Sequence, residues 1–308
     1  MGYAHISAVS RFFSYYIDTM KQRITGHTEL IGLLADPIRN SKSPMMHNTA
    51  FEALGLDYVY LVFEVDNATL KSAVEGLKAM KVRGFNVSMP NKGAILQYLD
   101  RLSTAAKLCS AVNTVVNEDG KLMGYNTDGI GFMEACKDEQ MDILGKKITV
   151  LGAGGAATAV CMQAALDGVK EISIFNGKDA FWQKALDNVR KINEHTSCKA
   201  QCFPLDDTDA LRREIADSAM LVNATGCGFC QPIGPCLIPD ASFLRKELMV
   251  FDVIYSPEET QLLAWAKEVG CKCSNGLDMM FFQGAAAFKL WTGKEMPLDV
   301  VREVFKTL

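Results

Sequence analysis

The stretch that decides the fold is Ile148–Leu166, ITVLGAGGAATAVCMQAAL. It contains no charged residue, so its length and composition alone would permit a membrane-spanning helix. Its large apolar side chains are few, however, and glycines stand at positions 152, 154 and 155. These features favour a buried strand, a tight turn and a helix of small residues. We therefore predict a strand–turn–helix unit of a parallel sheet.

The turn in this stretch, Gly152–Ala157, matches the pattern G-x-G-x-x-A. Gly152 permits the tight turn, Gly154 lets the backbone approach a pyrophosphate, and Ala157 permits close packing of helix on strand. The helix then points its free N–H groups at the phosphates. The pattern alone is weak and also fits a glycine-rich turn in an unrelated α/β protein. The strand before it and the helix after it favour dinucleotide binding.

The residues downstream repeat the same alternation of strand and helix. Such alternation is typical of a parallel sheet with helices on both faces, the doubly wound Rossmann type. We predict strands at 147–151, 171–175, 199–203, 218–223, 248–254 and 271–274, and helices at 155–167, 180–193, 208–216 and 258–269.

The residues upstream form a second α/β unit. We expect Ser43 to cap a helix that has Pro44 at its first position and stops at Gly55. Two C-terminal helices, 278–291 and 297–307, are expected to pack back on this first unit. The other elements that we predict are strands at 29–35, 58–65 and 85–89, a helix from 70 to 81, and a hairpin of 111–116 with 121–125.

The length of 308 residues agrees with two domains. We predict an N-terminal α/β substrate domain over 22–127, completed by 277–308, and a dinucleotide-binding domain over 128–276. Residues 1–21 are expected to be an extension outside both domains, for which disorder is one alternative. We expect no signal peptide there, because Arg11, Ser14 and Asp18 interrupt the apolar patch.

Composition excludes several classes of protein. With 49% hydrophobic and 22% charged residues the chain is neither disordered, collagen-like nor a coiled coil. A net charge of −4 without a basic run argues against nucleic-acid and membrane-surface partners.

The ten cysteines are scattered, which favours free thiols in a reducing, cytoplasmic compartment. Cys227 and Cys230 form a C-x-x-C pair, with Cys236, Cys271 and Cys273 further on. A redox or zinc site remains an alternative, but the pair lies in a Gly/Pro-rich loop, and we predict no metal.

Polar side chains gather in short segments of the first domain and in one C-terminal helix. Asn86 and Ser88 alternate on an otherwise apolar strand, and Gln283 lies among Met and Phe, so each needs a polar partner. Any one of these groups could serve only as a cap or turn bond. Together, converging hydroxyl and amide groups suit a polyhydroxylated ligand.

These segments, S-K-S-P (41–44), N-V-S-M-P-N-K (86–92), A-V-N-T (111–114), Y-N-T-D-G (125–129), G-A-G-G-A-A (152–157) and F-Q-G (282–284), resemble the shikimate dehydrogenase family. The forms S-M-P-N-K and F-N-x-K-D resemble its quinate/shikimate dehydrogenase branch, and the resemblance covers about residues 27–306. It implies reversible NAD(P)-linked oxidation of the ring alcohol of shikimate or quinate to the 3-dehydro ketone, in chorismate biosynthesis or quinate use.

The resemblance also implies a set of site residues. The catalytic pair falls on Lys92 and Asp128; an amine within reach of the substrate hydroxyl can take its proton as hydride leaves. The substrate-binding residues it implies are Ser41, Ser43, Tyr60, Ser88, Asn113, Tyr255 and Gln283. The cofactor-binding residues we predict are Gly152, Ala153, Gly154, Gly155, Ala156, Asn176, Lys178, Asp179, Val253 and Gly276.

Departures from the family bear on the cofactor. Where the family often has an arginine for the NADP phosphate, this chain has Gly177, and where the branch often has a lysine, it has Gly226. Asp179 would repel a 2′-phosphate, whereas Lys178 would attract it. We therefore predict that NAD is preferred, with NADP possible.

Two other functions agree with the same segments. One is a reductase of a related cyclohexene acid, such as an amino analogue; the other is a non-catalytic metabolite sensor, which Lys92 and Asp128 argue against. The partner we expect is a small-molecule substrate, and a homodimer is possible.

Overall fold

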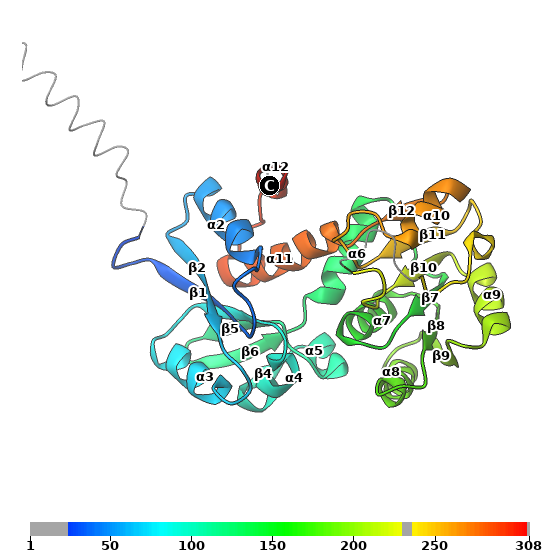
Figure 1. Cartoon of the computed structure of the whole chain (residues 1–308). Coiled ribbons are helices and arrows are strands. Elements are labelled where there is room, and N and C mark those ends of the chain that lie inside the picture. The colour runs from blue at the N-terminus through cyan, green and yellow to red at the C-terminus, as the bar shows by residue number, and fades with distance from the viewer. Residues whose placement is uncertain (1–23, 230–235, 307–308) are drawn as a thin grey trace, which may run out of the picture.

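The computed structural model describes residues 24–229 and 236–306. The chain forms two lobes, each built on a six-stranded sheet (Figure 1). The predicted α/β fold with two domains is confirmed. The extension at residues 1–21 lies outside the described part of the chain. No helix within the described residues is long and apolar enough to span a membrane.

The first sheet is mixed and has the strand order β2-β1-β3-β5-β6-β4. The parallel strands β1, β2 and β3 pair side by side, and the hairpin β5–β6 joins them antiparallel through β3. The strands are β1 (Glu29–Ala35), β2 (Tyr58–Glu64), β3 (Gly84–Val87), β4 (Arg101–Leu102), β5 (Thr114–Glu118) and β6 (Lys121–Tyr125).

The second sheet is wholly parallel, with the order β12-β11-β10-β7-β8-β9. The chain winds outward from β7 in one direction and then from β10 in the other, so the order reverses between these two strands. In such sheets ligands bind at the carboxyl ends of the strands that flank the reversal. The strands are β7 (Lys147–Leu151), β8 (Glu171–Asn176), β9 (Lys199–Pro204), β10 (Met220–Asn223), β11 (Met249–Asp252) and β12 (Lys272–Ser274).

Helices surround both sheets. The helices of the first lobe are α2 (Ser43–Ala53), α3 (Leu70–Ala79), α4 (Asn91–Ala94) and α5 (Thr104–Cys109). Those of the second are α7 (Gly155–Asp167), α8 (Trp182–His195), α9 (Thr208–Asp217) and α10 (Gln261–Val269). Helix α7 consists mainly of small side chains and is buried on nearly every side, as the sequence predicts.

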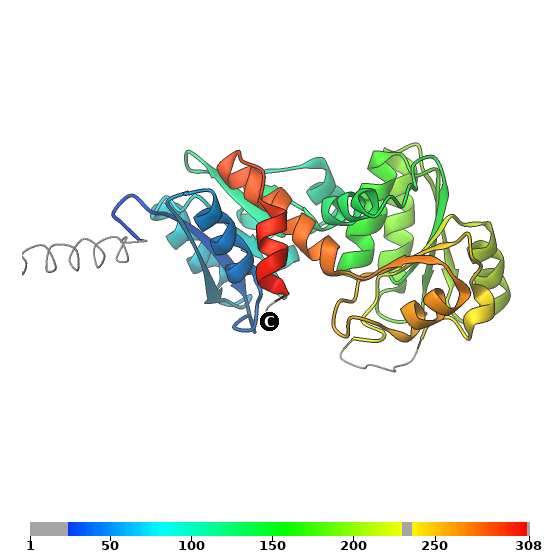
Figure 2. The same cartoon turned by 90° about the horizontal axis from the view of Figure 1, so that it is seen from above.

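Two long helices join the lobes. After β6 the chain enters α6 (Asp128–Asp138) and leads to the second sheet, and α11 (Leu277–Thr292) returns to the first, where Phe288 and Trp291 are buried. Helix α12 (Leu298–Phe305) lies beside α2 and α11 (Figure 2). From α12, Arg302 reaches Asp138 and Asp278 at 2.8 and 2.7 Å, so it ties the far end of α6 to the start of α11.

Some local expectations are wrong. Ser43 does not cap α2, because the cap position is Lys42, no side chain caps the helix, and Ser43 is its first residue. Helix α8 begins at Trp182 rather than 180, because Asp179 accepts a bond from the backbone N–H of Phe181 and holds a turn there. Helices α4, α5 and α6 were not predicted, since short or glycine-containing segments show no clear periodicity.

A buried histidine lies at the centre of the first lobe's core. His47 stacks on Tyr60 with ring centroids 4.6 Å apart and meets the edge of Trp291. Neither ring nitrogen has a hydrogen-bond partner among the described residues. Burial lowers the pKa of His47 from 6.5 to about 3, so the ring is neutral in the folded protein at ordinary pH.

This burial predicts a specific acid sensitivity. Because the unfolded chain protonates His47 near pH 6.5 and the folded chain only near pH 3, the free energy of unfolding should fall as pH drops between them. The slope from this group is about 1.4 kcal/mol per pH unit. Denaturant unfolding across this range should show that His47→Phe loses this contribution, whereas His27→Gln, at an exposed position, keeps it. Equal acid slopes in wild type and His47→Phe would contradict the argument.

Candidate active site

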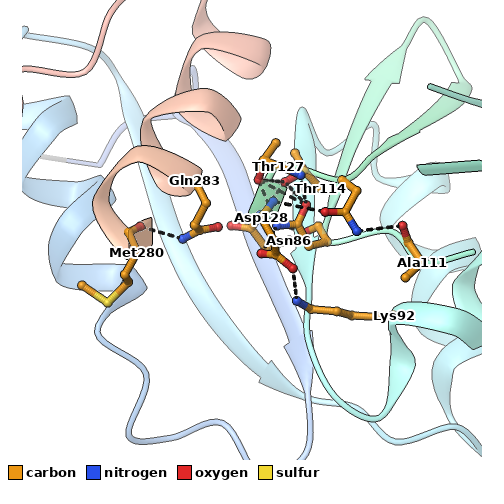
Figure 3. Close-up of polar contacts among 10 residues, drawn as sticks. Asn86, Lys92, Ala111, Thr114, Thr127, Asp128, Met280 and Gln283 are labelled. Atoms are coloured by element: carbon orange, nitrogen blue, oxygen red, sulfur yellow. Dashed lines mark hydrogen bonds and ion pairs between the residues drawn. The ribbon is translucent and has the colours of Figure 1, made fainter. Parts of the chain in front are cut away.

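Lys92 and Asp128 face each other, with Gln283 of α11 nearby (Figure 3). Lys92 lies in α4, which is separated from the end of β3 by three residues, and Asp128 is the first residue of α6. The lysine Nζ lies 2.6 Å from Asp128 Oδ2, and the two side chains are 24% and 17% exposed. The pair is therefore close enough to share one ligand oxygen and open enough for a ligand to reach it.

The other carboxylate oxygen of Asp128 is fixed by an amide. Asn113 Nδ2 donates to Asp128 Oδ1 at 2.8 Å and to Thr127 Oγ1 at 2.9 Å. Asn113 Oδ1 in turn accepts from the backbone N–H of Thr127 at 2.8 Å. Both amide hydrogens of Asn113 are thus used, and they hold Asp128 in one orientation towards Lys92.

A second buried amide lies behind the first. Asn86 on β3 donates to the carbonyl oxygen of Asn113 at 2.9 Å and to Thr114 Oγ1 at 3.0 Å. Its oxygen accepts from the Tyr60 hydroxyl at 2.7 Å. Burial raises the pKa of Tyr60, so its hydroxyl keeps the proton that it donates. The network runs without a gap from the aromatic core to the carboxylate.

The partly exposed polar side chains surround this network. Ser43 has no capping role and its hydroxyl lies close enough to Tyr60 to influence that hydroxyl. The Ser41 hydroxyl accepts from the Ser43 backbone N–H at 3.2 Å, and Ser88 comes just after β3. Gln283 reaches from α11 towards Asp128 while its Nε2 donates to the Met280 carbonyl at 3.0 Å (Figure 3).

Tyr255 is placed differently from the other predicted substrate residues. It lies in the loop after β11 in the second lobe and is 37% exposed. No hydrogen bond joins it to the described residues around Asp128, so its role stays a prediction.

The glycine-rich loop fits a pyrophosphate. Gly152 has φ +104°, and a Cβ there would lie 2.6 Å from Thr225 Cγ2. Gly154 and Gly155 have nothing within 4 Å of a would-be Cβ, so their backbone is open on the side that a ligand would approach. Because α7 begins at Gly155 and has no side-chain cap, its first N–H groups remain available to phosphate oxygens.

The remaining predicted cofactor residues lie around this loop. Ala153 is buried and Ala156 partly so. Asn176, at the tip of β8, donates to Asp179 Oδ1 at 3.0 Å, while Lys178 is exposed beside them. Across the strand reversal, a Cβ on Gly276 would overlap the carbonyl of Val253, so these two backbones pack directly.

Two cysteines of the predicted cysteine loop region lie within the described residues. Cys227 and Cys236 line one small cavity of about 10 Å³ with Asn223 and Asp252, barely enough room for one water. Cys230 lies outside the described residues. Among the residues that are described, no three His, Cys, Asp or Glu side chains come together as metal ligands.

Sequence reasoning missed the groups that orient the site. Asn86 was noted as needing a partner but was given no role, and Thr127 was passed over. Also missed was Asp252, whose Oδ1 accepts from Asn223 Nδ2 at 2.9 Å and whose Oδ2 accepts from the Thr260 hydroxyl at 2.7 Å. Burial raises the pKa of this carboxyl. The only available signal was a polar residue inside or just after an apolar strand.

Comparison with known proteins decides the family. A curated shikimate dehydrogenase (NADP(+)) from Listeria monocytogenes is 60% identical over 283 residues, which cover 92% of this chain and 97% of that protein. The chain belongs to the shikimate dehydrogenase family. Family models agree: a shikimate dehydrogenase substrate-binding domain matches residues 33–115, and a shikimate 5′-dehydrogenase C-terminal domain matches 276–304.

Solved structures of this family have the same fold. The shikimate 5-dehydrogenase of Listeria monocytogenes in complex with shikimate and NAD superposes with a TM-score of 0.91 at 58% identity, over 93% of this chain and 99% of that one. A quinate dehydrogenase from Corynebacterium glutamicum in complex with NAD gives a TM-score of 0.81 at 29% identity, over 91% and 99%. The chain is thus an oxidoreductase of the shikimate dehydrogenase family.

The crossing of α6 and α11 predicts a sensitive position. A Cβ on Gly131 would lie 2.5 Å from the Met279 carbonyl oxygen and 2.8 Å from Gln283 Cβ. We expect Gly131→Ala to destabilise the fold by about 1–3 kcal/mol and to raise the KM for the ring substrate, because it moves Gln283 relative to Asp128. Denaturant unfolding and steady-state kinetics measure both effects.

A matched control is Gly76→Ala on α3, where a Cβ meets nothing within 4 Å. It should stabilise the helix by about 0.5–1 kcal/mol and leave the KM unchanged. Unaltered stability in Gly131→Ala would contradict the prediction, because it would mean that α6 and α11 move apart at no cost in the free energy of unfolding.

Proposed function

We propose that this chain catalyses the reversible oxidation of the ring alcohol of shikimate to its 3-dehydro ketone with a nicotinamide dinucleotide. The observation that carries the proposal is the Lys92–Asp128 contact of 2.6 Å, in which the amide of Asn113 holds the carboxylate. The name of the Listeria relative supports the substrate.

The residues of this chain suit each step. Ser41, Ser43 and Ser88 and the amide of Gln283 offer partly exposed hydrogen-bonding groups to a polyhydroxylated ring. The Lys92 amine takes the hydroxyl proton during oxidation and returns it during ketone reduction, while Asp128 holds it in place. A nicotinamide cofactor bound at the glycine-rich loop supplies hydride acceptance and donation.

Quinate is a second candidate substrate, favoured by the resemblance to the quinate dehydrogenase from Corynebacterium glutamicum. Quinate and shikimate differ at the ring carbon that bears the carboxylate, and one contact there can shift preference by roughly 1–3 kcal/mol. Steady-state oxidation of each acid with NAD and NADP tests the activity and the preference. Ligand binding without turnover would instead favour a metabolite sensor.

The role of Lys92 predicts a large loss of turnover. Lys92→Met keeps much of the side-chain volume but removes the proton carrier, so kcat should fall by about 10²–10⁴-fold while the KM for the cofactor changes little. Lys78→Met is a suitable control, because this lysine also pairs with an aspartate, Asp100 at 3.3 Å, but on the outside of the lobe. Near-normal turnover in Lys92→Met would remove this lysine from the mechanism.

The tip of β8 predicts a preference for NAD. Asp179 presents a carboxylate there, and Gly177 supplies no cation for a 2′-phosphate. The curated relatives are named for NADP(+), which favours NADP and stands against this preference, although the Listeria complex contains NAD. We expect a kcat/KM at least about tenfold higher with NADH than with NADPH in ketone reduction.

Gly177→Arg should narrow or reverse this difference, because a guanidinium would bind the extra phosphate. Lys178→Ala should lower the efficiency with NADPH and leave that with NADH unchanged. A higher efficiency of the wild type with NADPH would overturn the preference. A loss of that efficiency in Lys178→Ala would then show that Lys178 binds the 2′-phosphate.

A further inference from the structure

The glycine-rich loop is braced from behind by two buried polar side chains. Thr158 on α7 and Asn188 on α8 are each only 2% exposed. The Thr158 hydroxyl donates to the Gly154 carbonyl at 2.8 Å and more weakly to that of Ala153 at 3.4 Å. Asn188 Nδ2 donates to the Thr158 hydroxyl oxygen at 3.0 Å.

The direction of this chain of hydrogen bonds is fixed. Gly154 is the cap residue of α7, and its carbonyl also accepts from the Thr158 backbone N–H at 3.0 Å, so both lone pairs are engaged. A hydroxyl that gives its one proton to Gly154 needs a donor of its own, and the Asn188 amide is that donor. With its carbonyl held towards the helix, the Gly154–Gly155 peptide must direct its N–H the opposite way, towards the open side of the loop.

Packing alone does not explain these two residues. Their neighbours on α7 are alanine, valine, cysteine and methionine, and an apolar pair would fill the space between the helices without burying polar atoms. Within the described residues, the pair's side chains bond only to each other and to the backbone carbonyls of the loop. The hydrogen bonds of Thr158 and Asn188 therefore act on the backbone of the glycine-rich loop.

We propose that Thr158 and Asn188 are positioning residues for the cofactor pyrophosphate. They hold Gly154 so that the N–H groups at the start of α7 point at the phosphate oxygens. The inference rests on the proposed function, since it takes the loop to bind a dinucleotide. Because NAD and NADP share the pyrophosphate, the effect should be equal for both cofactors, unlike any effect at Gly177 or Lys178.

The test is a fluorescence titration of NADH and of NADPH. Thr158→Val, which removes the hydroxyl at constant shape, should raise the Kd of both cofactors by about 3- to 10-fold, and Thr158→Ser should restore it. Asn188→Leu should give a similar rise. The double variant should be no worse than either single one, because the two residues act through one bond to Gly154.

Asn193→Leu is the matched control. Asn193 lies on the same helix α8 and makes two hydrogen bonds to the backbone of Ala200 in β9, at 2.8 and 3.0 Å, away from the loop. We expect this variant to lose stability in thermal unfolding without a change in either Kd. The KM for the ring substrate should stay constant in all variants.

Four results separate the possible failures. An unchanged Kd in folded Thr158→Val overturns the inference, as does a rise that Asn193→Leu shares. Fully additive effects in the double variant show that Thr158 and Asn188 do not act through one bond and also overturn it. A wild-type protein that binds neither cofactor overturns the proposed function, and this inference with it.

Discussion

The relative position of the two lobes depends on the close crossing of α6 and α11 at Gly131. No side chain fits there, so the backbones of the two helices set their own separation. Asp128 begins one of these helices and Gln283 lies on the other, directly at the crossing. Arg302 joins the C-terminal end of α6 to the N-terminal end of α11 through ion pairs with Asp138 and Asp278. The contact between the two helices that join the lobes therefore also sets the geometry of the candidate site.

Sequence reasoning was most successful where structure is local. The strand 147–151, the turn at Gly152 and the helix from 155 were predicted with their observed bounds, because apolar runs, glycines and small residues determine them without distant partners. The hairpin β5–β6 was likewise predicted from its Glu-Asp-Gly turn. The cap of α2 was assigned wrongly, since the propensity of serine for helix starts does not reveal that Ser43 lies beside Tyr60.

The site could be predicted only in part. Lys92 and Asp128 were identified through motif resemblance, and the structure brings them together across 36 positions of sequence. Of the residues that orient them, Asn113 was predicted as a site residue, but the role of Asn86 escaped, because it exists only through pairing between strands. Asn86 meets Asn113 only because β3 pairs with β5 in this register, and no local pattern in the sequence encodes that register.

The polar residues of the site fall into two groups, a buried group that orients Asp128 and a partly exposed group that a ligand can reach. Asn86, Asn113 and Thr127 are each at most 8% exposed and use their donors on one another, on Thr114 and on Asp128. For Asn113 to bind a ligand it would have to release Thr127 or the carboxylate, and a buried amide that loses a partner carries a cost of about 1–3 kcal/mol. The hydroxyls of Ser41, Ser43 and Ser88 are partly open and carry no such cost. The serines, Gln283 and Lys92 are therefore the groups that can meet a ligand near Asp128 without such a cost, whereas substrate binding by Asn113 stays a prediction.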